Sequence, residues 1–310
     1  MIDQDGGIDD ALALILALRS PELEVAGITA VSGNVTVEQA TLNGLRVVDL
    51  LNRRDVPVAR GLGNPLVRDP VRATSFHGKD GLGDSNLPVS RIRPTEKSAL
   101  DTISNELAIS KHRDLTIICT GPLTNIAALL TGFPESAKMI KELVIMGGAY
   151  GVTEYGVGNV TPVAEFNLYA DPEAAKIVFE SGVPIEAVGL DVTMIPKNQL
   201  TLREYAGIQK SKGRVAAFAA EILNKNIHKH GIFALHDPMT VAAKVKPSLF
   251  EFAIYKVQVE TRGEITSGMT VADRRESLSE SKMQGEKMMI CKNVNSRGFK
   301  QLLLDRLTNA

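Results

Sequence analysis

Short apolar segments alternate with longer amphipathic segments along most of the chain, and this alternation restricts its possible folds more than any other feature. Apolar segments typical of buried strands lie at residues 25–31, 115–119, 143–146 and 185–190. Amphipathic segments typical of helices lie at residues 37–51, 96–110, 125–130, 172–180 and 202–210. This order predicts an α/β fold whose mostly parallel sheet is covered by helices on both faces. An added strand at residues 252–261 and a closing helix at 299–307 complete the prediction.

Polar residues and glycines follow the predicted strands directly. They are Asp5, Ser32-Gly33-Asn34, Thr120-Gly121-Pro122, Gly147-Gly148-Ala149 and Asp191. Ligands of open parallel sheets bind beyond the carboxyl ends of the strands. The sequence therefore predicts that the functional site lies at this edge of the sheet.

Four aspartates, Asp3, Asp5, Asp9 and Asp10, lie close together at the start of the chain, around a glycine turn and the beginning of an apolar helix. Acidic residues near a helix N-terminus complement the helix dipole, which explains one or two of them. Four packed carboxylates repel one another, and this raises their pKa values unless a cation neutralises them. Oxygen ligands of this kind suit a hard divalent cation such as Ca²⁺ or Mg²⁺.

A second polar cluster lies in the glycine-rich segment 147–167, which has little apolar periodicity. A loop of this length in a compact domain is usually functional or disordered. Asn159, Glu165 and Asn167 offer amide and carboxylate groups suited to the hydroxyls of a sugar, although a solvated loop would have the same composition.

A third cluster, His236-Asp237, precedes a predicted helix at residues 239–245. Asp237 is expected to be the N-cap of this helix, a purely structural role, and a lone histidine is usually structural too. Together the two residues could instead supply a metal carboxylate and a proton donor.

Composition excludes several classes of protein. The 310 residues carry a formal net charge of −1, unlike the basic surface of a nucleic-acid binder. No apolar run approaches the roughly 20 residues that cross a bilayer, and no signal-peptide pattern opens the chain. Cys119 and Cys291 show no metal-type spacing, so two buried thiols are expected. We predict a cytoplasmic protein without nucleic-acid or membrane partners, formed as a single domain over residues 1–310.

Taken together, these motifs resemble the inosine-uridine-preferring nucleoside hydrolase family. The matching stretches are Asp3-Gln4-Asp5-Gly6-Gly7-Ile8-Asp9-Asp10, Gly33-Asn34, Phe76-His77-Gly78-Lys79-Asp80-Gly81-Leu82-Gly83, Thr120-Gly121-Pro122-Leu123-Thr124-Asn125, the stretch from Asn159 to Asn167, His236-Asp237-Pro238, and Val259-Glu260-Thr261-Arg262-Gly263. The resemblance implies a Rossmann-like α/β domain, a homodimer or homotetramer, and hydrolysis of the N-glycosidic bond of ribonucleosides. It also implies a Ca²⁺ cofactor and a bound water activated by an aspartate.

The resemblance assigns a role to each matching position. It implies that Ca²⁺ is held by Asp5, Asp10, Asp237 and the backbone carbonyl of Thr120. Asp5 would also be the general base, and His236 the acid for the leaving base. The ribose would be held by Asp9, Asn34, Asn167, Asn159 and Glu165, with His77 beside the base and Asp3 orienting the aspartate cluster.

Two departures from the family pattern concern the turn and the base. Gly6 stands where the family usually has proline, which leaves the turn less rigid. The segment 224–233 offers His228, His230 and Phe233 where family members often cover the base with aromatic residues. A basic, solvated loop is the favoured interpretation of this segment, and a histidine that closes over the base is the alternative. The preference for purine or pyrimidine stays open.

Two other functions compete with this one. A phosphatase of the haloacid-dehalogenase type also opens with Asp-x-Asp, but its motif continues with a hydroxyl residue and would leave the Asn159–Asn167 stretch unexplained. A nucleoside-binding protein without catalytic activity would need the sugar contacts but not a base such as Asp5.

Overall fold

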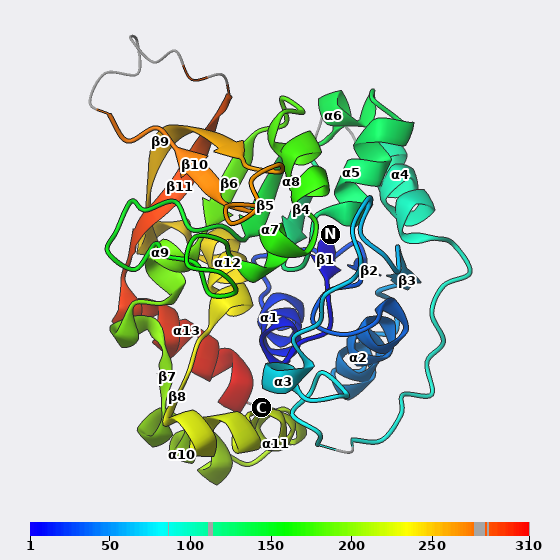
Figure 1. The fold of residues 1–310 in the computed structure, drawn as a ribbon. Coiled ribbons are helices and arrows are strands. Elements are labelled where there is room, and N and C mark those ends of the chain that lie inside the picture. Colours follow the sequence, from blue (N-terminus) through cyan, green and yellow to red (C-terminus); the bar gives the residue numbers. More distant parts are fainter. Residues whose placement is uncertain (86, 111–113, 276–282, 284, 310) are drawn as a thin grey trace.

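The computed structural model describes residues 1–85, 87–110, 114–275, 283 and 285–309 (Figure 1). Its main strands are β1 (Ile2–Gln4), β2 (Ile28–Ala30), β3 (Val58–Arg60), β4 (Thr116–Cys119), β5 (Glu142–Met146), β6 (Ile185–Val188), β9 (Phe250–Val259), β10 (Thr270–Ala272) and β11 (Glu286–Val294). Within the described residues they form one nine-stranded sheet in the order β10-β9-β11-β6-β5-β4-β1-β2-β3. A separate antiparallel pair consists of β7 (Leu200–Thr201) and β8 (Ile232–Phe233).

The sheet is parallel from β3 across to β11, and β9 and β10 add to it antiparallel at one edge. β1 lies in the interior, with Ile2 paired with Ile28 of β2 on one side and Ile118 of β4 on the other. The mostly parallel sheet predicted from the sequence is thus confirmed. Because the parallel strands share one direction, Asp5, Asn34, Thr120 and Gly147 leave the sheet at the same edge.

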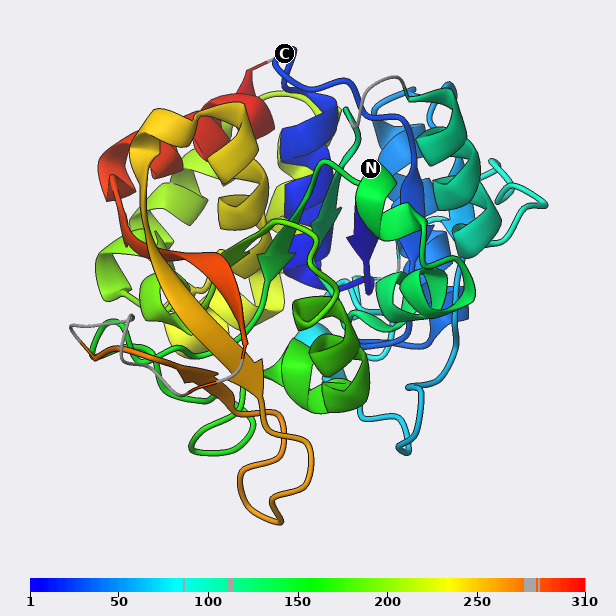
Figure 2. The same cartoon turned by 90° about the horizontal axis from the view of Figure 1, so that it is seen from above.

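Helices cover both faces of this sheet, as Figure 2 shows from above. They are α1 (Ile8–Leu18), α2 (Val37–Leu50), α3 (Thr74–His77), α4 (Ala99–Ile109), α5 (Thr124–Gly132), α6 (Ser136–Met139), α7 (Phe166–Ala170), α8 (Pro172–Phe179), α9 (Leu190–Thr193), α10 (Leu202–Lys210), α11 (Arg214–His230), α12 (His236–Val245) and α13 (Ser296–Thr308). Successive strand residues point to opposite faces. Accordingly Ile118 packs in the core with α1 and α12, whereas Ile117 packs in the core with α5 and α8.

Helix α1 is central to the larger core. All of its eleven residues are buried, and it packs against α2, α12 and α13. A helix that is apolar on every side belongs in the interior of a protein. Its first turn carries Asp9 and Asp10, so the aspartate cluster is anchored to a fully enclosed element. Among the described residues, no helix is both long enough and apolar enough to traverse a lipid bilayer.

Most predicted elements are observed. The end of the strand predicted at 185–190 is wrong, because β6 stops at Val188 and Leu190 begins α9. A short apolar run does not distinguish a strand from a buried helical turn. The cysteines Cys119 and Cys291 are both buried and unbonded, as expected.

Two local interpretations are also corrected. The segment 224–233 is not a solvated loop: residues up to His230 continue α11, whose buried side includes Leu223, Asn226 and Ile227, and the helix ends at Gly231 with φ 78°. The polar residues of its outer side concealed this helical spacing. Asp237 is not an N-cap, because α12 begins one residue earlier at His236, which places Asp237 within the first turn.

Candidate active site

A cavity of about 690 Å³ opens at the carboxyl edge of the parallel strands. The predicted site residues that line it are Asp9, Asn34, His77, Thr120, Asn159, Glu165, Asn167, His236 and Asp237. They come from six segments that are distant in the sequence. Asp5 and Asp10 are absent from this lining and fully buried, so they lie behind the residues that face the cavity.

Three carboxylates beside this cavity form a cluster that could hold a cation. Asp9, Asp10 and Asp237 each offer an oxygen atom, and these three atoms lie within 4.8 Å of one another. Burial, together with the charges of the neighbouring aspartates, raises the pKa of Asp237 well above its ordinary value. Asp9 Oδ1 is buried without a hydrogen-bond partner among the described residues. Buried like charges and an unpartnered carboxylate oxygen fit a hard divalent cation such as Ca²⁺, which takes oxygen ligands.

Asp10 is held by the strand ends and the glycine turn. Gly7 donates its backbone N–H to Asp10 Oδ2 at 2.7 Å, and the Thr120 hydroxyl donates to Asp10 Oδ1 at 2.7 Å. The Thr120 carbonyl, a predicted metal ligand, accepts a hydrogen bond from Asn167 Nδ2 at 3.0 Å. A carbonyl has two lone pairs, so this contact leaves one available.

Asp5 is held by Asn34, and its carboxyl group also lies against that of Asp10. Both of its oxygens accept hydrogen bonds from Asn34: Oδ2 from the backbone N–H at 2.7 Å and Oδ1 from the side-chain amide at 2.8 Å. Burial, followed by the charge of the adjacent Asp10, raises the pKa of Asp5 well above its ordinary value. Gly33 lies so close that a Cβ there would be 2.0 Å from Asp5 Oδ2. The position of the Asp5 carboxylate is therefore fixed on several sides.

Asp3 does not orient the aspartate cluster through its side chain. Asp3 Oδ1 accepts hydrogen bonds from the Thr29 hydroxyl at 2.6 Å and from Asn125 Nδ2 at 2.8 Å. Burial raises its pKa to about 7. Only its backbone carbonyl reaches the site, where it accepts the Thr120 N–H at 2.8 Å. The side chain of Asp3 therefore ties neighbouring segments of the sheet together.

The glycine-rich segment is ordered by two acidic residues. Glu165 caps α7, accepting the N–H of Asn167 at 2.9 Å and that of Gly148 at 3.0 Å, and burial raises its pKa. Asp191 accepts the backbone N–H groups of Tyr150 and Val152 at 2.8 and 2.7 Å. The segment is thus tied at both ends, although Asn159 itself is exposed.

The two predicted histidines at the cavity are neutral near pH 7. Burial lowers the pKa of His77 to about 3 and that of His236 to about 4. His77 Nδ1 accepts the N–H of Ile8 at 3.1 Å, and His236 Nδ1 lies 2.8 Å from the hydroxyl oxygen of Thr193. Neutral imidazoles act here as hydrogen-bonding groups.

Aromatic rings form another wall of the cavity. Phe76 and His230 line it and stack on each other, with ring centroids 6.1 Å apart, and Phe76 also stacks on Phe233. His228 instead contacts Tyr205 edge-on and is not among the lining residues. Of the two histidines that could cover a base, only His230 is at the cavity. Phe76 begins one of the stretches that resemble the family, but nothing in the sequence indicated a role for its side chain.

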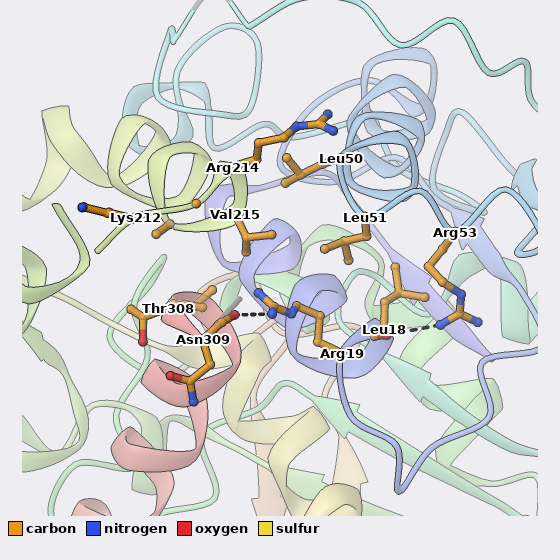
Figure 3. Close-up of a pocket in the computed structure, with 13 residues that line it drawn as sticks. Leu18, Arg19, Leu50, Leu51, Arg53, Lys212, Arg214, Val215, Thr308 and Asn309 are labelled. Carbon is orange, nitrogen blue, oxygen red and sulfur yellow. Dashed lines mark hydrogen bonds between the residues drawn. The ribbon is translucent and has the colours of Figure 1, made fainter. Parts of the chain in front are cut away.

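A second cavity, of about 370 Å³, lies away from the aspartate cluster beside the C-terminal end of α1 (Figure 3). Leu18, Leu51 and Val215 form its apolar surface, while Arg19 donates to the Asn309 carbonyl and Arg53 to that of Leu18. None of the described residues that line it is an aspartate, glutamate or histidine. It therefore offers no carboxylate or imidazole ligand for a divalent cation.

Comparisons with known proteins agree with this geometry. The family model described as inosine-uridine preferring nucleoside hydrolase matches residues 1–301. The pyrimidine-specific ribonucleoside hydrolase RihA of Shigella boydii serotype 4 is 42% identical, over 99% of this chain and 97% of the relative, as is the protein of that name from Escherichia coli O81.

Solved structures give the same result. The plant nucleoside hydrolase PpNRh1 superimposes with a TM-score of 0.91 at 32% identity, over 100% of this chain and 98% of that one. A purine-preferring ribonucleoside hydrolase from Gardnerella vaginalis superimposes with a TM-score of 0.86 at 34% identity, over 99% and 97% of the two chains. The family model's match to residues 1–301 and the relatives at 42% identity over nearly the whole chain show that this protein belongs to the inosine-uridine-preferring nucleoside hydrolase family.

Proposed function

We propose that this chain acts as one domain that hydrolyses ribonucleosides to ribose and free base with the help of Ca²⁺. The observation that carries the proposal is the buried cluster of Asp9, Asp10 and Asp237 beside the cavity at the carboxyl edge of the sheet. Asp10 and Asp237 would hold the ion, with Asp5 and the Thr120 carbonyl as further ligands. When bound, Ca²⁺ would bring the attacking water and the ribose hydroxyls together and lower the pKa of that water.

The protein's own residues would then direct the reaction. The water oxygen forms a bond to C1′ of the ribose, and the bond from C1′ to the base nitrogen breaks with its electron pair going to the base. Asp5 takes the proton of the water, with its carboxylate held in position by the two hydrogen bonds from Asn34. The negative charge that develops on the base is stabilised by the neutral imidazole of His236. The proton that Asp5 took from the water then passes through solvent to the base nitrogen, which completes the free base and restores the Asp5 carboxylate.

Sugar contacts would fix the substrate for this step. Asp9, Asn34 and Asn167 would bind the 2′- and 3′-hydroxyls, and Asp9 Oδ1 has no other partner among the described residues. Asn159 and Glu165 would bind the 5′-hydroxyl. Because a hydroxyl of the ribose is part of this scheme, 2′-deoxyribosides should be poor substrates.

We also propose that pyrimidine ribosides are preferred over purine ribosides. The relatives at 42% identity are named pyrimidine-specific, whereas the purine-preferring hydrolase of known structure is 34% identical. His77 and His236 would lie beside the base, and His230 and Phe76 offer a stacked aromatic wall for it.

Release of ribose from uridine, cytidine, inosine, adenosine and guanosine tests the proposal, first with Ca²⁺ and then with a chelator. We expect release that needs no phosphate, stops with the chelator and is fastest with uridine and cytidine. Asp5→Ala should abolish it, and p-nitrophenyl phosphate should not be cleaved. No release from any riboside by folded, Ca²⁺-loaded protein would refute the hydrolase assignment and favour a binding protein.

A cytoplasmic location and a homodimeric or homotetrameric state stay predictions. Cell fractionation tests the first, and sedimentation velocity of the purified chain tests the second.

A further inference from the structure

Helix α9 is a single buried turn that connects β6 to the cavity. Its residues Asp191 and Thr193 are both fully buried. Two positions along a helix differ by about 200° in direction, so these side chains point to opposite sides. Asp191 faces the glycine-rich segment, and Thr193 faces α12, where its hydroxyl oxygen lies 2.8 Å from His236 Nδ1.

The direction of the hydrogen bond between Thr193 and His236 decides which ring nitrogen carries the proton. Among the described residues, the Thr193 hydroxyl has no other hydrogen-bond partner. If His236 Nδ1 carried the proton, it would donate to this oxygen and the buried hydroxyl hydrogen would have no acceptor. A buried donor without a partner costs about 1–3 kcal/mol. The threonine hydroxyl therefore donates to Nδ1, and the ring proton is on Nε2.

His77 has the same tautomer, but here a backbone N–H group fixes it. Its Nδ1 accepts the backbone N–H of Ile8, which cannot change direction, so its proton is also on Nε2. Both histidines line the cavity. The cavity thus has two imidazoles whose Nε2–H groups are available as donors.

We propose that Thr193 is a positioning residue that keeps His236 in the Nε2–H tautomer, so that the ring donates a hydrogen bond to the departing base. This inference rests on the proposed function, because it assigns His236 to the leaving group. It requires no proton transfer: the donated hydrogen bond stabilises negative charge as it develops on the base. With the proton on Nδ1, the nitrogen left for the base would be an acceptor and would repel that charge.

Two substitutions at Thr193 distinguish the effect of its hydroxyl group from the effect of its side-chain volume. Thr193→Val keeps the volume and removes the donor, whereas Thr193→Ser keeps the donor and is the matched control. Nitrogen-15 NMR of the free protein reports the tautomer, with His236→Gln used to assign the signals. We expect protonated Nε2 in the parent and in Thr193→Ser, and a mixture of tautomers in Thr193→Val.

Kinetics with two leaving groups provide the second measurement. Loss of an outer contact to a functional histidine typically costs about 10–100-fold, so kcat for uridine should fall by this factor in Thr193→Val and recover in Thr193→Ser. With p-nitrophenyl riboside, whose leaving group needs no such stabilisation, kcat should change less than about twofold. A merely structural role for Thr193 would lower both rates together.

The proposal is overturned if the parent protein carries the His236 proton on Nδ1, or if Thr193→Val leaves the tautomer unchanged. The parent measurement decides the matter even if the valine variant fails to fold. Failure of the proposed function has a different signature: no riboside would be cleaved by the parent, whatever tautomer the NMR spectrum shows.

Discussion

Substituting Gly33 with alanine should displace the proposed general base while leaving most of the site intact. The backbone of Gly33 is open to any residue, but an added Cβ would lie 2.0 Å from Asp5 Oδ2 and 2.8 Å from Asp5 Cβ. The carboxylate oxygen has to move by about 1.4 Å to reach an ordinary contact of 3.4 Å. Rotation of the side chain alone does not suffice, because the Asp5 Cβ is also too close.

The size of this displacement gives the expected loss of catalytic rate. A shift of about 1 Å in a catalytic group typically lowers the rate about 10²-fold, which corresponds to about 2.7 kcal/mol. The hydrogen bond from the Asn34 N–H to Asp5 Oδ2 would be lost with it. We expect kcat for uridine to fall at least 10²-fold in Gly33→Ala, and KM to rise as well, because Asp5 is also a proposed Ca²⁺ ligand and Asn34 a proposed ribose contact.

The matched control is Gly132→Ala at the end of α5, where an added Cβ has no neighbour within 4 Å. Its kcat should equal that of the parent. Ribose release and the thermal melting temperature should be measured on all three proteins. A folded Gly33→Ala protein with a kcat within about threefold of the parent would refute the assignment of Asp5 as the base.

Three further predictions concern the glycine-rich segment, the base and the cation. Asp191→Asn replaces one of the oxygens that accept the backbone N–H groups of Tyr150 and Val152 by a donor. Charge-assisted hydrogen bonds are worth about 1.5–3 kcal/mol each. The KM should therefore rise about 10-fold or more, and limited proteolysis within residues 147–167 should accelerate. His230→Ala should change the ratio of kcat/KM for uridine and inosine by about fivefold, as loss of about 1 kcal/mol of ring stacking implies, whereas His228→Ala should leave the ratio unchanged. Burial raises the pKa of Asp3 from 3.8 to about 7, and those of Asp5 and Asp9 rise as well. These carboxyls make the native state bind more protons than the unfolded state. The lowered pKa values of His77 and His236 act in the opposite direction, but the buried carboxyls with raised pKa values, which also include Asp10, Glu165 and Asp237, outnumber them. The melting temperature of Ca²⁺-free protein should therefore fall as the pH rises from about 4 to 7, and Ca²⁺ should raise it most at the upper end; a flat profile would contradict the buried-carboxylate account.

The sequence predicts the parallel part of the sheet well because those strands are buried on both faces and form continuous apolar runs. Strands β3 and β10 have three residues each, as β2 does, but unlike β2 they do not lie within a longer apolar segment: Pro57 precedes β3 and Asp273 follows β10. Strand β11 was not predicted for another reason. Its residues Glu286, Lys287 and Met289 are exposed, so its sequence has the pattern of a mostly polar segment.

The site was predicted in outline, because its residues follow strand ends in a recognisable order. The sequence does not show which side chains each of the aspartates contacts. One oxygen each of Asp9, Asp10 and Asp237 lie within 4.8 Å of one another, while Asp5 lies between Asn34 and Asp10. The role of Thr193 was also hidden, since a threonine becomes informative only when its partner across the fold is known.

The burial of α1 has a consequence for how the protein is made. This helix is apolar on every side, yet α12, which covers much of it, is more than two hundred residues further along the chain. During synthesis α1 emerges early and remains exposed until most of the polypeptide has followed. Contacts between such distant segments form slowly, and apolar surface exposed meanwhile favours aggregation. The feature that anchors the aspartates in the finished protein therefore makes the growing chain dependent on protection, whether from chaperones or from a low concentration of nascent molecules.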